Sequence, residues 1–141
     1  MAKAIAVAQQ RGPWPLTFAS VEADGRSRLM QVSPELWGDA VIVRKDTPTS
    51  YHLSVVVDDA RQGITHVTRG LDLLAATHLH RLLQVLLELP EPVYHHHRLI
   101  TDEGGRKLAK SAGDTALSSL RRQGWTPARV RAHLGLPPAT A

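Results

Sequence analysis

Residues 104–111 form the stretch of this 141-residue sequence that is best suited to bind an anion; they read GGRKLAKS. Two lysines three residues apart follow paired glycines and precede a hydroxyl, where a strand-like pattern gives way to a helix-like one. Open α/β sheets bind phosphates at loops of this kind, beyond the carboxyl ends of strands. Lys107 and Lys110 could therefore neutralise a polyphosphate. A solvated basic turn is the alternative for any isolated pair of lysines.

Arg69 is a second candidate, because it ends a predicted strand and is followed by a glycine that would let a ligand approach. A guanidinium fork there suits a carboxylate or a phosphate, and an ion pair with Asp72 is the alternative. Asp58 and Asp59 end the preceding predicted strand. Adjacent strand residues point to opposite faces, so these two carboxylates are not expected to form an acid–base dyad on one substrate.

Histidines raise the question of a metal site, since residues 95–97 are consecutive histidines and His78 and His80 precede them. Strand alternation places only His95 and His97 on one face, and no cysteine or carboxylate lies at zinc-ligand spacing. We therefore expect no metal site and interpret these residues as packed or groove-facing. The sequence contains no cysteine, which excludes a disulfide or a thiolate zinc site within it.

The composition is typical of a globular domain, with 43% hydrophobic and 21% charged residues. No apolar run approaches the roughly 18 residues of a membrane span, and the start of the sequence does not resemble a signal peptide. We expect a cytoplasmic protein with no membrane partner. A net charge of +4 is compatible with a polyanionic partner but does not identify one.

Periodicity and turn residues predict the elements that would position these side chains. A helix over 2–11 precedes a hairpin that turns at Asp24-Gly25, and a leucine-faced amphipathic helix covers 77–89. Asp114 is expected to cap a helix that ends at Gly124, and Thr126-Pro127 to begin another that stops at Gly135. The remaining segments are predicted as strands: 40–43, 53–57 (buried on both faces), 63–70 and 93–100. This order, with its helical crossover, indicates an α/β fold with at least one parallel strand pair.

Residues 37–111 resemble the second half of the catalytic domain of class I glutamyl-type aminoacyl-tRNA synthetases. The resemblance is carried by the order of SYHL, VVVDDA, GITHVTRG and KLAKS. It is strongest with the bacterial glutamyl-Q tRNA(Asp) synthetases, short paralogues of glutamyl-tRNA synthetase without its anticodon-binding domain. It implies half of a Rossmann-like nucleotide-binding fold over 37–113, with a mostly parallel sheet. A hairpin remnant of an insertion would occupy 1–36, and C-terminal helices would occupy 114–141.

The same resemblance implies a reaction: ATP-dependent activation of glutamate and its transfer to the queuosine of tRNA(Asp), with Mg²⁺ accompanying ATP. KLAKS is similar to the family's KMSKS signature, with alanine where serine is usual. By position, Lys107 and Lys110 would be catalytic, and Tyr51 and Arg69 would bind glutamate. The ATP-binding set would be Lys107, Leu108, Ala109, Lys110 and Ser111.

Two features of the family have no counterpart in the sequence: the HIGH-type signature that holds adenine and ribose, and the zinc-binding cysteine cluster. The chain is therefore expected to correspond to the C-terminal portion of such an enzyme, inactive alone, with an exposed sheet edge that permits self-association. Two alternatives stay open. One is a fragment of a discriminating glutamyl-tRNA synthetase, and the other is a non-catalytic remnant that binds nucleotide or tRNA.

Overall fold

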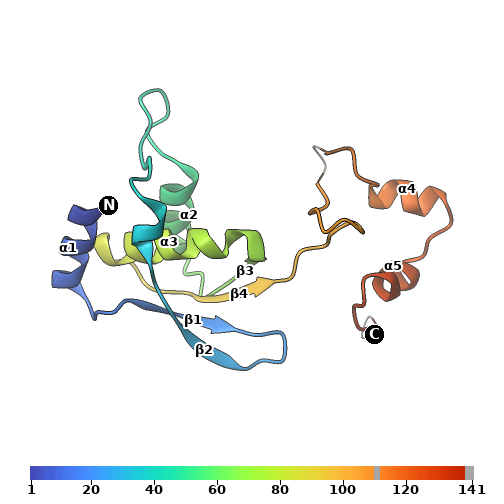
Figure 1. The fold of residues 1–141 in the computed structure, drawn as a ribbon, viewed down its shortest axis with the longest axis horizontal. Coiled ribbons are helices and arrows are strands. Elements are labelled where there is room, and N and C mark those ends of the chain that lie inside the picture. The colour runs from blue at the N-terminus through green and yellow to red at the C-terminus, as the bar shows by residue number, and fades with distance from the viewer. Residues whose placement is uncertain (110–111, 139–141) are drawn as a thin grey trace. The chain divides into compact units, whose positions relative to one another are not determined.

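The computed structural model describes residues 1–109 and 112–138, which form two compact units (Figure 1). The first unit is Met1–Arg98 and the second is Leu99–Ala141. The two units are described separately. No helix among the described residues is long and apolar enough to cross a membrane.

A four-stranded sheet organises the first unit, with strand order β2-β1-β4-β3. The central strand β4 pairs in parallel with both β1 and β3, whereas β1 and β2 form an antiparallel hairpin. Gly25 has a φ of +82° in the turn of this hairpin, a conformation that favours glycine. The predicted hairpin and the mostly parallel α/β sheet are therefore confirmed. The strands are β1 (Thr17–Val21), β2 (Ser27–Gln31), β3 (His66–Gly70) and β4 (Val93–His97).

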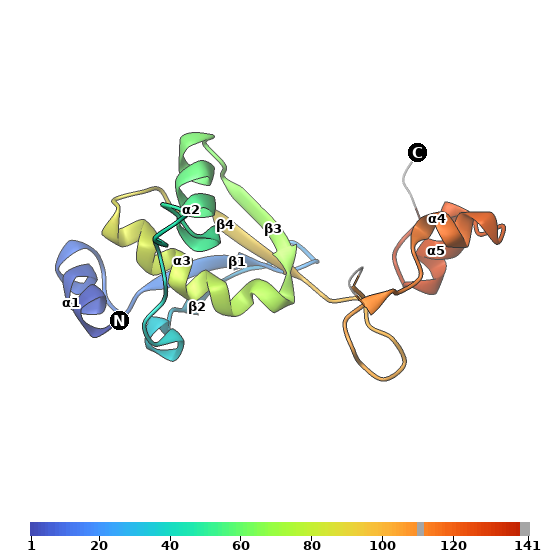
Figure 2. The same ribbon diagram turned by 90° about the horizontal axis from the view of Figure 1, so that it is seen from above.

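Helix α3 (Leu74–Leu86) is the crossover that joins β3 to β4, and it runs along one face of the sheet (Figure 2). Helices α1 (Ala2–Arg11) and α2 (Tyr51–Arg61) both pack against α3. The predicted N-terminal helix is confirmed, and α3 begins and ends three residues earlier than the predicted 77–89. Its buried leucines, Leu79, Leu82 and Leu83, belong to the predicted apolar face.

Two apolar clusters form the core of the first unit. One lies on the sheet and is built from Leu16, Phe18, Val32 and Tyr94. The other joins α2 to α3 through Val56, Leu79 and Leu83. Both clusters use α3, because Leu74 and Val85 pack against the first one. This helix therefore fixes α2 relative to β3 and β4, the elements that carry the candidate site.

The predicted strand at 53–57 is wrong, because these residues lie within helix α2. Ser50 caps this helix, and its side-chain oxygen accepts a hydrogen bond from the backbone N–H of Leu53 at 3.4 Å. Within the run only Val56 is fully buried, on the side that faces α3. Packing against α3 therefore overrides the strand preference of the β-branched residues.

The predicted strand at 40–43 is also wrong, since these residues form no strand. Ala40 and Ile42 pack against the cluster between α2 and α3, while Val41 and Val43 are exposed. Alternate residues are thus buried as in a strand. The segment nevertheless lies over helices and has no strand beside it with which to form a ladder.

The second unit consists of a loop and two short helices, α4 (Leu117–Arg122) and α5 (Pro127–His133). The predicted start and stop of α5 are confirmed: Thr126 accepts a hydrogen bond from the N–H of Arg129 at 3.2 Å, and Gly135 follows the helix with φ +62°. The predicted cap of α4 is wrong, because the helix begins after Ala116. Asp114 instead binds Arg106.

Candidate functional site

Arg69 lies at the end of β3 with only 9% of its surface exposed. Its guanidinium donates to Nδ1 of His80 at 3.0 Å and to the hydroxyl of Thr77, both on α3. The third donor, Nε, points to Nε2 of His96 on β4 at 3.4 Å. The guanidinium carbon lies 5.1 Å from the centre of the Tyr94 ring. A buried strand end and a helix face thus hold the cation on several sides.

All four of these partners of Arg69 are uncharged at neutral pH. Burial, followed by the field of Arg69, lowers the pKa of His80 to about 3 and that of His96 to about 4. Tyr94 has a raised pKa, chiefly because it is buried. The groups that contact the guanidinium therefore carry no negative charge, and the acidic side chain that interacts with it electrostatically is Asp59 on α2.

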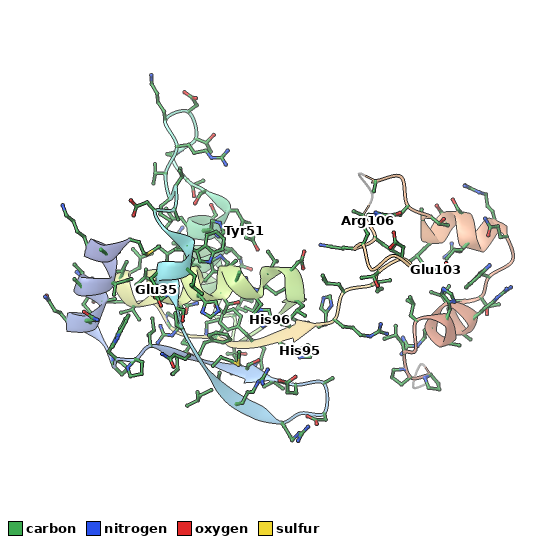
Figure 3. All side chains as sticks on the ribbon, in the orientation of Figure 1. Glu35, Tyr51, His95, His96, Glu103 and Arg106 are labelled. Atoms are coloured by element: carbon green, nitrogen blue, oxygen red, sulfur yellow. The ribbon has the colours of Figure 1, made fainter. Side chains whose placement is uncertain are left out.

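Tyr51 is the first residue of α2, and 54% of its surface is exposed (Figure 3). Its ring centre lies 5.9 Å from that of His80 and 5.5 Å from that of His52. Because His80 also accepts from Arg69, one histidine contacts both residues that the sequence assigns to glutamate. Tyr51 and Arg69 therefore share His80 as a neighbour, with Arg69 buried and Tyr51 exposed.

Asp58 and Asp59 lie on α2 rather than at a strand end, which corrects their predicted setting. Consecutive helical residues do not face each other, so they still form no dyad on one substrate. The pKa of Asp59 is raised, mainly by partial burial, while Arg69 acts in the opposite direction. The Asp59 carboxylate therefore interacts electrostatically with the Arg69 guanidinium.

Lys107 lies in the second unit, where it forms an isolated antiparallel bridge with Thr101. Arg106 orders the loop between them (Figure 3): it binds Asp102 at 3.0 Å and makes a two-pronged contact with Asp114 at 2.6 and 2.9 Å. Asp114 also accepts from the backbone N–H of Ala109 at 2.7 Å. Hydrogen bonds from Arg106 and Ala109 lower the pKa of Asp114 to about 2, so it is charged at neutral pH.

The predicted ATP-binding residues fall partly inside this loop. Lys107 and Leu108 are exposed, and Ala109 is half-buried. Lys110 and Ser111 lie outside the described residues. The pairing of Arg106 with Asp114, which fixes the loop around Ala109, was not predicted from the sequence.

Among the described residues, no three or more histidine or acidic side chains are grouped so that they could hold a metal ion. Histidines at the site face Arg69 or each other instead: His52 Nδ1 lies 3.0 Å from His80 Nε2. Residues 95 and 96 lie on β4, where the ring of His95 contacts the carbonyl oxygen of Val21 at 2.7 Å.

Three polar residues lie on the buried face of α3: Thr77, His80 and Gln84. Thr77 and Gln84 were not considered in the sequence, and the contact of His80 with Arg69 was not predicted. They occur at i, i+3 and i+7, the spacing of one helix face, within an otherwise leucine-rich stretch. Thr77 and His80 bind Arg69, and Gln84 donates to the hydroxyl of Tyr94 at 2.9 Å. Polar residues at buried helical spacing were the sequence signal for this site.

Comparison with known proteins identifies the family. The family described as tRNA synthetases class I (E and Q), catalytic domain, matches residues 24–138. The chain belongs to this family. A glutamyl-Q tRNA(Asp) synthetase of Rhodobacter capsulatus is 58% identical over 99 residues, which cover 70% of this chain and 36% of that protein. Another protein of that name, from Synechococcus, is 44% identical over 121 residues, covering 86% of this chain and 40% of the relative.

Solved synthetase structures share the fold. A glutamate-tRNA synthetase from Elizabethkingia anophelis matches with a TM-score of 0.54 and 30% identity, over 72% of this chain and 20% of that one. A glutamate tRNA ligase from Elizabethkingia meningosepticum, solved in complex with its amino acid, matches equally well. The chain thus spans well under half the length of these synthetases. Its fold and family are those of a class I synthetase catalytic domain, as the sequence resemblance implied.

Proposed function

We propose that this chain supplies the glutamate-binding and ATP-contacting half of a synthetase that activates glutamate with ATP and transfers it to the queuosine of tRNA(Asp). The observation that carries the proposal is the buried position of the Arg69 guanidinium among uncharged partners. A buried guanidinium with neutral partners is a binding site for a carboxylate, the group that distinguishes glutamate from glutamine. Tyr51 borders the same site and offers its hydroxyl to the amino acid.

In this reaction a glutamate carboxylate oxygen attacks the α-phosphorus of ATP, and the bond to the leaving pyrophosphate breaks. Negative charge grows on the phosphates as it breaks, so Lys107 and Lys110 would stabilise the transition state. Arg69 and Tyr51 would orient the amino acid for attack. Mg²⁺ would arrive bound to the phosphates of ATP, because oxygen ligands from a nucleotide suit this ion.

Glutamate recognition is tested by titrating the ¹⁵N-labelled chain with L-glutamate, with L-glutamine as the neutral comparison. We expect glutamate alone to shift the Arg69 side-chain resonances and the backbone amide signals of β3 and β4, and Arg69→Gln to abolish the amide shifts. Tyr51→Phe should weaken binding a few-fold by removing one hydroxyl. Arg61→Gln, on the exposed end of α2, is the matched control and should bind as the wild type does. Equal responses to glutamate and glutamine would overturn the carboxylate assignment.

The role of the basic loop is tested with ATP. Lys107→Ala and Lys110→Ala should each weaken ATP binding, while Lys45→Ala, at an exposed position in the first unit, should not. If all three variants bind ATP as the wild type does, the loop assignment fails. The alternative, a non-catalytic remnant, would also bind nucleotide or tRNA, so this set tests the loop assignment, and catalysis by the assembled enzyme separates the two functions.

Catalysis by the 141-residue chain alone is expected to be absent. Losing one preorganised contact to a transition state typically costs about 3 kcal/mol, and the synthetase relatives devote a much longer chain to the reaction. Glutamate-dependent ATP–pyrophosphate exchange should therefore appear only when the remaining portion of the Rhodobacter capsulatus relative is added in cis or in trans. Exchange by the chain alone that Lys110→Ala abolishes would contradict this.

The most specific part of the proposal is the identity of the tRNA that accepts glutamate. The relatives in the sequence comparison are named for tRNA(Asp), and the solved structures are glutamate-tRNA synthetases, so glutamate is common to both. The assembled enzyme should transfer glutamate to tRNA(Asp) that contains queuosine and not to tRNA(Asp) that lacks it. Transfer to tRNA(Glu) instead would favour a fragment of a discriminating glutamyl-tRNA synthetase.

A further inference from the structure

His80 is an almost completely buried partner of Arg69, with only 1% of its surface exposed. It lies on α3 and joins three elements: its Nδ1 faces Arg69 on β3, its Nε2 faces His52 on α2, and its ring lies beside that of Tyr51. No acidic side chain takes part in these contacts. A buried histidine that touches both proposed glutamate ligands is placed to control their geometry.

The donor chemistry of arginine fixes the protonation of this histidine. A guanidinium only donates hydrogen bonds, so His80 Nδ1, 3.0 Å from Arg69 Nη1, must be an acceptor without a proton. The single proton of the neutral ring then lies on Nε2. It is donated to His52 Nδ1 at 3.0 Å, which makes His52 an acceptor at Nδ1 as well. Donation therefore runs in one direction, from Arg69 through His80 to His52.

Packing around His52 fixes the last member of this series of hydrogen bonds. The ring of Trp37 lies edge-on to His52 with centres 5.1 Å apart, and Trp37 Nε1 donates to the carbonyl oxygen of Ala75 on α3 at 2.7 Å. Trp37 thus holds the ring of His52, which belongs to α2, next to α3. The orientation of the His80 ring is determined from both of its nitrogens.

We propose that His80 is a positioning residue: its unprotonated Nδ1, oriented through His52, holds the Arg69 guanidinium where it receives the carboxylate of glutamate. This inference rests on the proposed function for its ligand, but the contact between His80 and Arg69 is independent of it. The charged and titratable groups that face His80 are Arg69 from β3 and Tyr51 and His52 from α2. A proton on Nδ1 would meet the guanidinium N–H directly and place two positive charges side by side in a buried site. The lowered pKa of His80, caused first by burial and then by Arg69, agrees with a neutral ring.

Three substitutions separate positioning from simple packing. His80→Asn places an amide oxygen close to the position of Nδ1, so it should keep the Arg69 contact. His80→Gln places its amide near the position of Nε2, and His80→Leu removes the acceptor while keeping an apolar side chain. His66→Asn, at an exposed position on β3, is the control for the loss of a histidine.

The first measurement is NMR of the full chain without ligand. Long-range ¹H–¹⁵N correlations should show an unprotonated Nδ1 and a protonated Nε2 on His80 at pH 7. The Arg69 Nη1–H signal, which reports the contact with His80, should be protected from solvent exchange in the wild type, in His80→Asn and in His66→Asn, and lose protection in His80→Gln and His80→Leu. A protonated Nδ1 in the wild type overturns the proposal, even if a variant fails to fold.

The second measurement is glutamate affinity by the same titration as above. A hydrogen bond to a charged group is worth on the order of tenfold in affinity, so His80→Gln and His80→Leu should bind at least tenfold more weakly. His80→Asn should stay within about threefold of the wild type. Equal binding by all variants overturns the proposal. If the wild type itself does not respond to glutamate, the proposed function fails, while the Nδ1 state and the Arg69 Nη1–H protection still decide the role of His80.

Discussion

The two units of this chain hold their candidate functional residues by different means. In the first unit, Arg69 sits in the interior, and its position follows from the packing of α3 on the sheet. In the second unit, the loop that contains Lys107 is fixed by ion pairs of Arg106 with Asp102 and Asp114, all near the surface. The described residues of the hydrophobic core all belong to the first unit. The proposed glutamate site is therefore expected to be rigid, and the proposed ATP loop adjustable.

The largest difference between the units should appear in core substitutions. Phe18 is completely buried and makes edge contacts with Tyr94 at 5.6 Å and with His96 at 6.3 Å between ring centres. Phe18→Ala should lower the free energy of unfolding of the first unit by about 3–5 kcal/mol, because it opens a cavity under the site. Leu117→Ala, on α4 with 69% of the leucine exposed, should change stability by no more than about 0.5 kcal/mol.

Urea unfolding followed by the amide signals of β1 and β4 measures the effect of Phe18→Ala, and signals from α4 measure that of Leu117→Ala. The contrast between units is wrong if Phe18→Ala costs less than Leu117→Ala. Phe18→Leu is a useful intermediate, since it retains most of the apolar volume and should recover much of the loss.

Lowering the pH should also affect the stability of the two units differently, by a smaller amount than the core substitutions do. The folded pKa values of His80 and His96, about 3 and about 4, lie below the ordinary value of 6.5. Between those values the unfolded chain binds more protons than the folded one, so stability is full above pH 6.5 and falls as the pH drops toward 4. The raised pKa of Asp59 works in the opposite direction, near the ordinary carboxyl range.

Asp114 gives the second unit a different acid range. Its pKa of about 2 lies below the ordinary 3.8, so its stabilising effect is present above pH 3.8 and lost between 3.8 and 2. The urea midpoint of the first unit should therefore fall between pH 7 and pH 5, while the loop signals around Ala109 stay unchanged. His80→Asn should reduce this pH dependence and His66→Asn should not. A pH-independent midpoint in the wild type would contradict the burial of neutral histidines.

Local sequence signals were sufficient where a single residue type decides the backbone. Asp24-Gly25 gave the hairpin turn and Thr126-Pro127 the start of α5, because these residues have strong intrinsic conformational preferences. The run at 53–57, four apolar residues and one serine, was wrongly predicted as a strand because so short a run has no period that separates strand from helix. Its helix depends on the Ser50 cap and on packing against Leu79 and Leu83, which are distant in sequence.

The candidate site shows the same limit. Arg69 and Tyr51 were assigned through the family resemblance, and the structure brings both against His80. His80 was interpreted as a packed or groove-facing histidine rather than a metal ligand, and its contact with Arg69 was not predicted because Arg69 lies on another element. Asp114 was predicted as a helix cap for a similar reason: the sequence does not reveal that Arg106, eight residues earlier, competes for it. Long-range partners decide the role of a polar side chain, and one sequence does not display them.

Two matched helix caps give the smallest and sharpest comparison of the units. Ser50 caps α2 through Leu53, and Thr126 caps α5 through Arg129, each with a side-chain oxygen that accepts from a backbone N–H. Replacing either by alanine removes a cap worth about 1 kcal/mol. Helix α2 contributes buried Val56 to the core, whereas no described residue of α5 is buried.

Loss of the helix cap should therefore change a different measured property in each unit. Ser50→Ala should lower the urea midpoint of the first unit, because α2 unfolds together with the core it packs against. Thr126→Ala should instead reduce the hydrogen-exchange protection of the first turn of α5, because a short helix without buried side chains frays locally. Ser50→Thr and Thr126→Ser keep the caps and should restore each property. If Ser50→Ala only frays α2 and leaves the midpoint unchanged, then α2 is not part of the cooperative core that positions Tyr51.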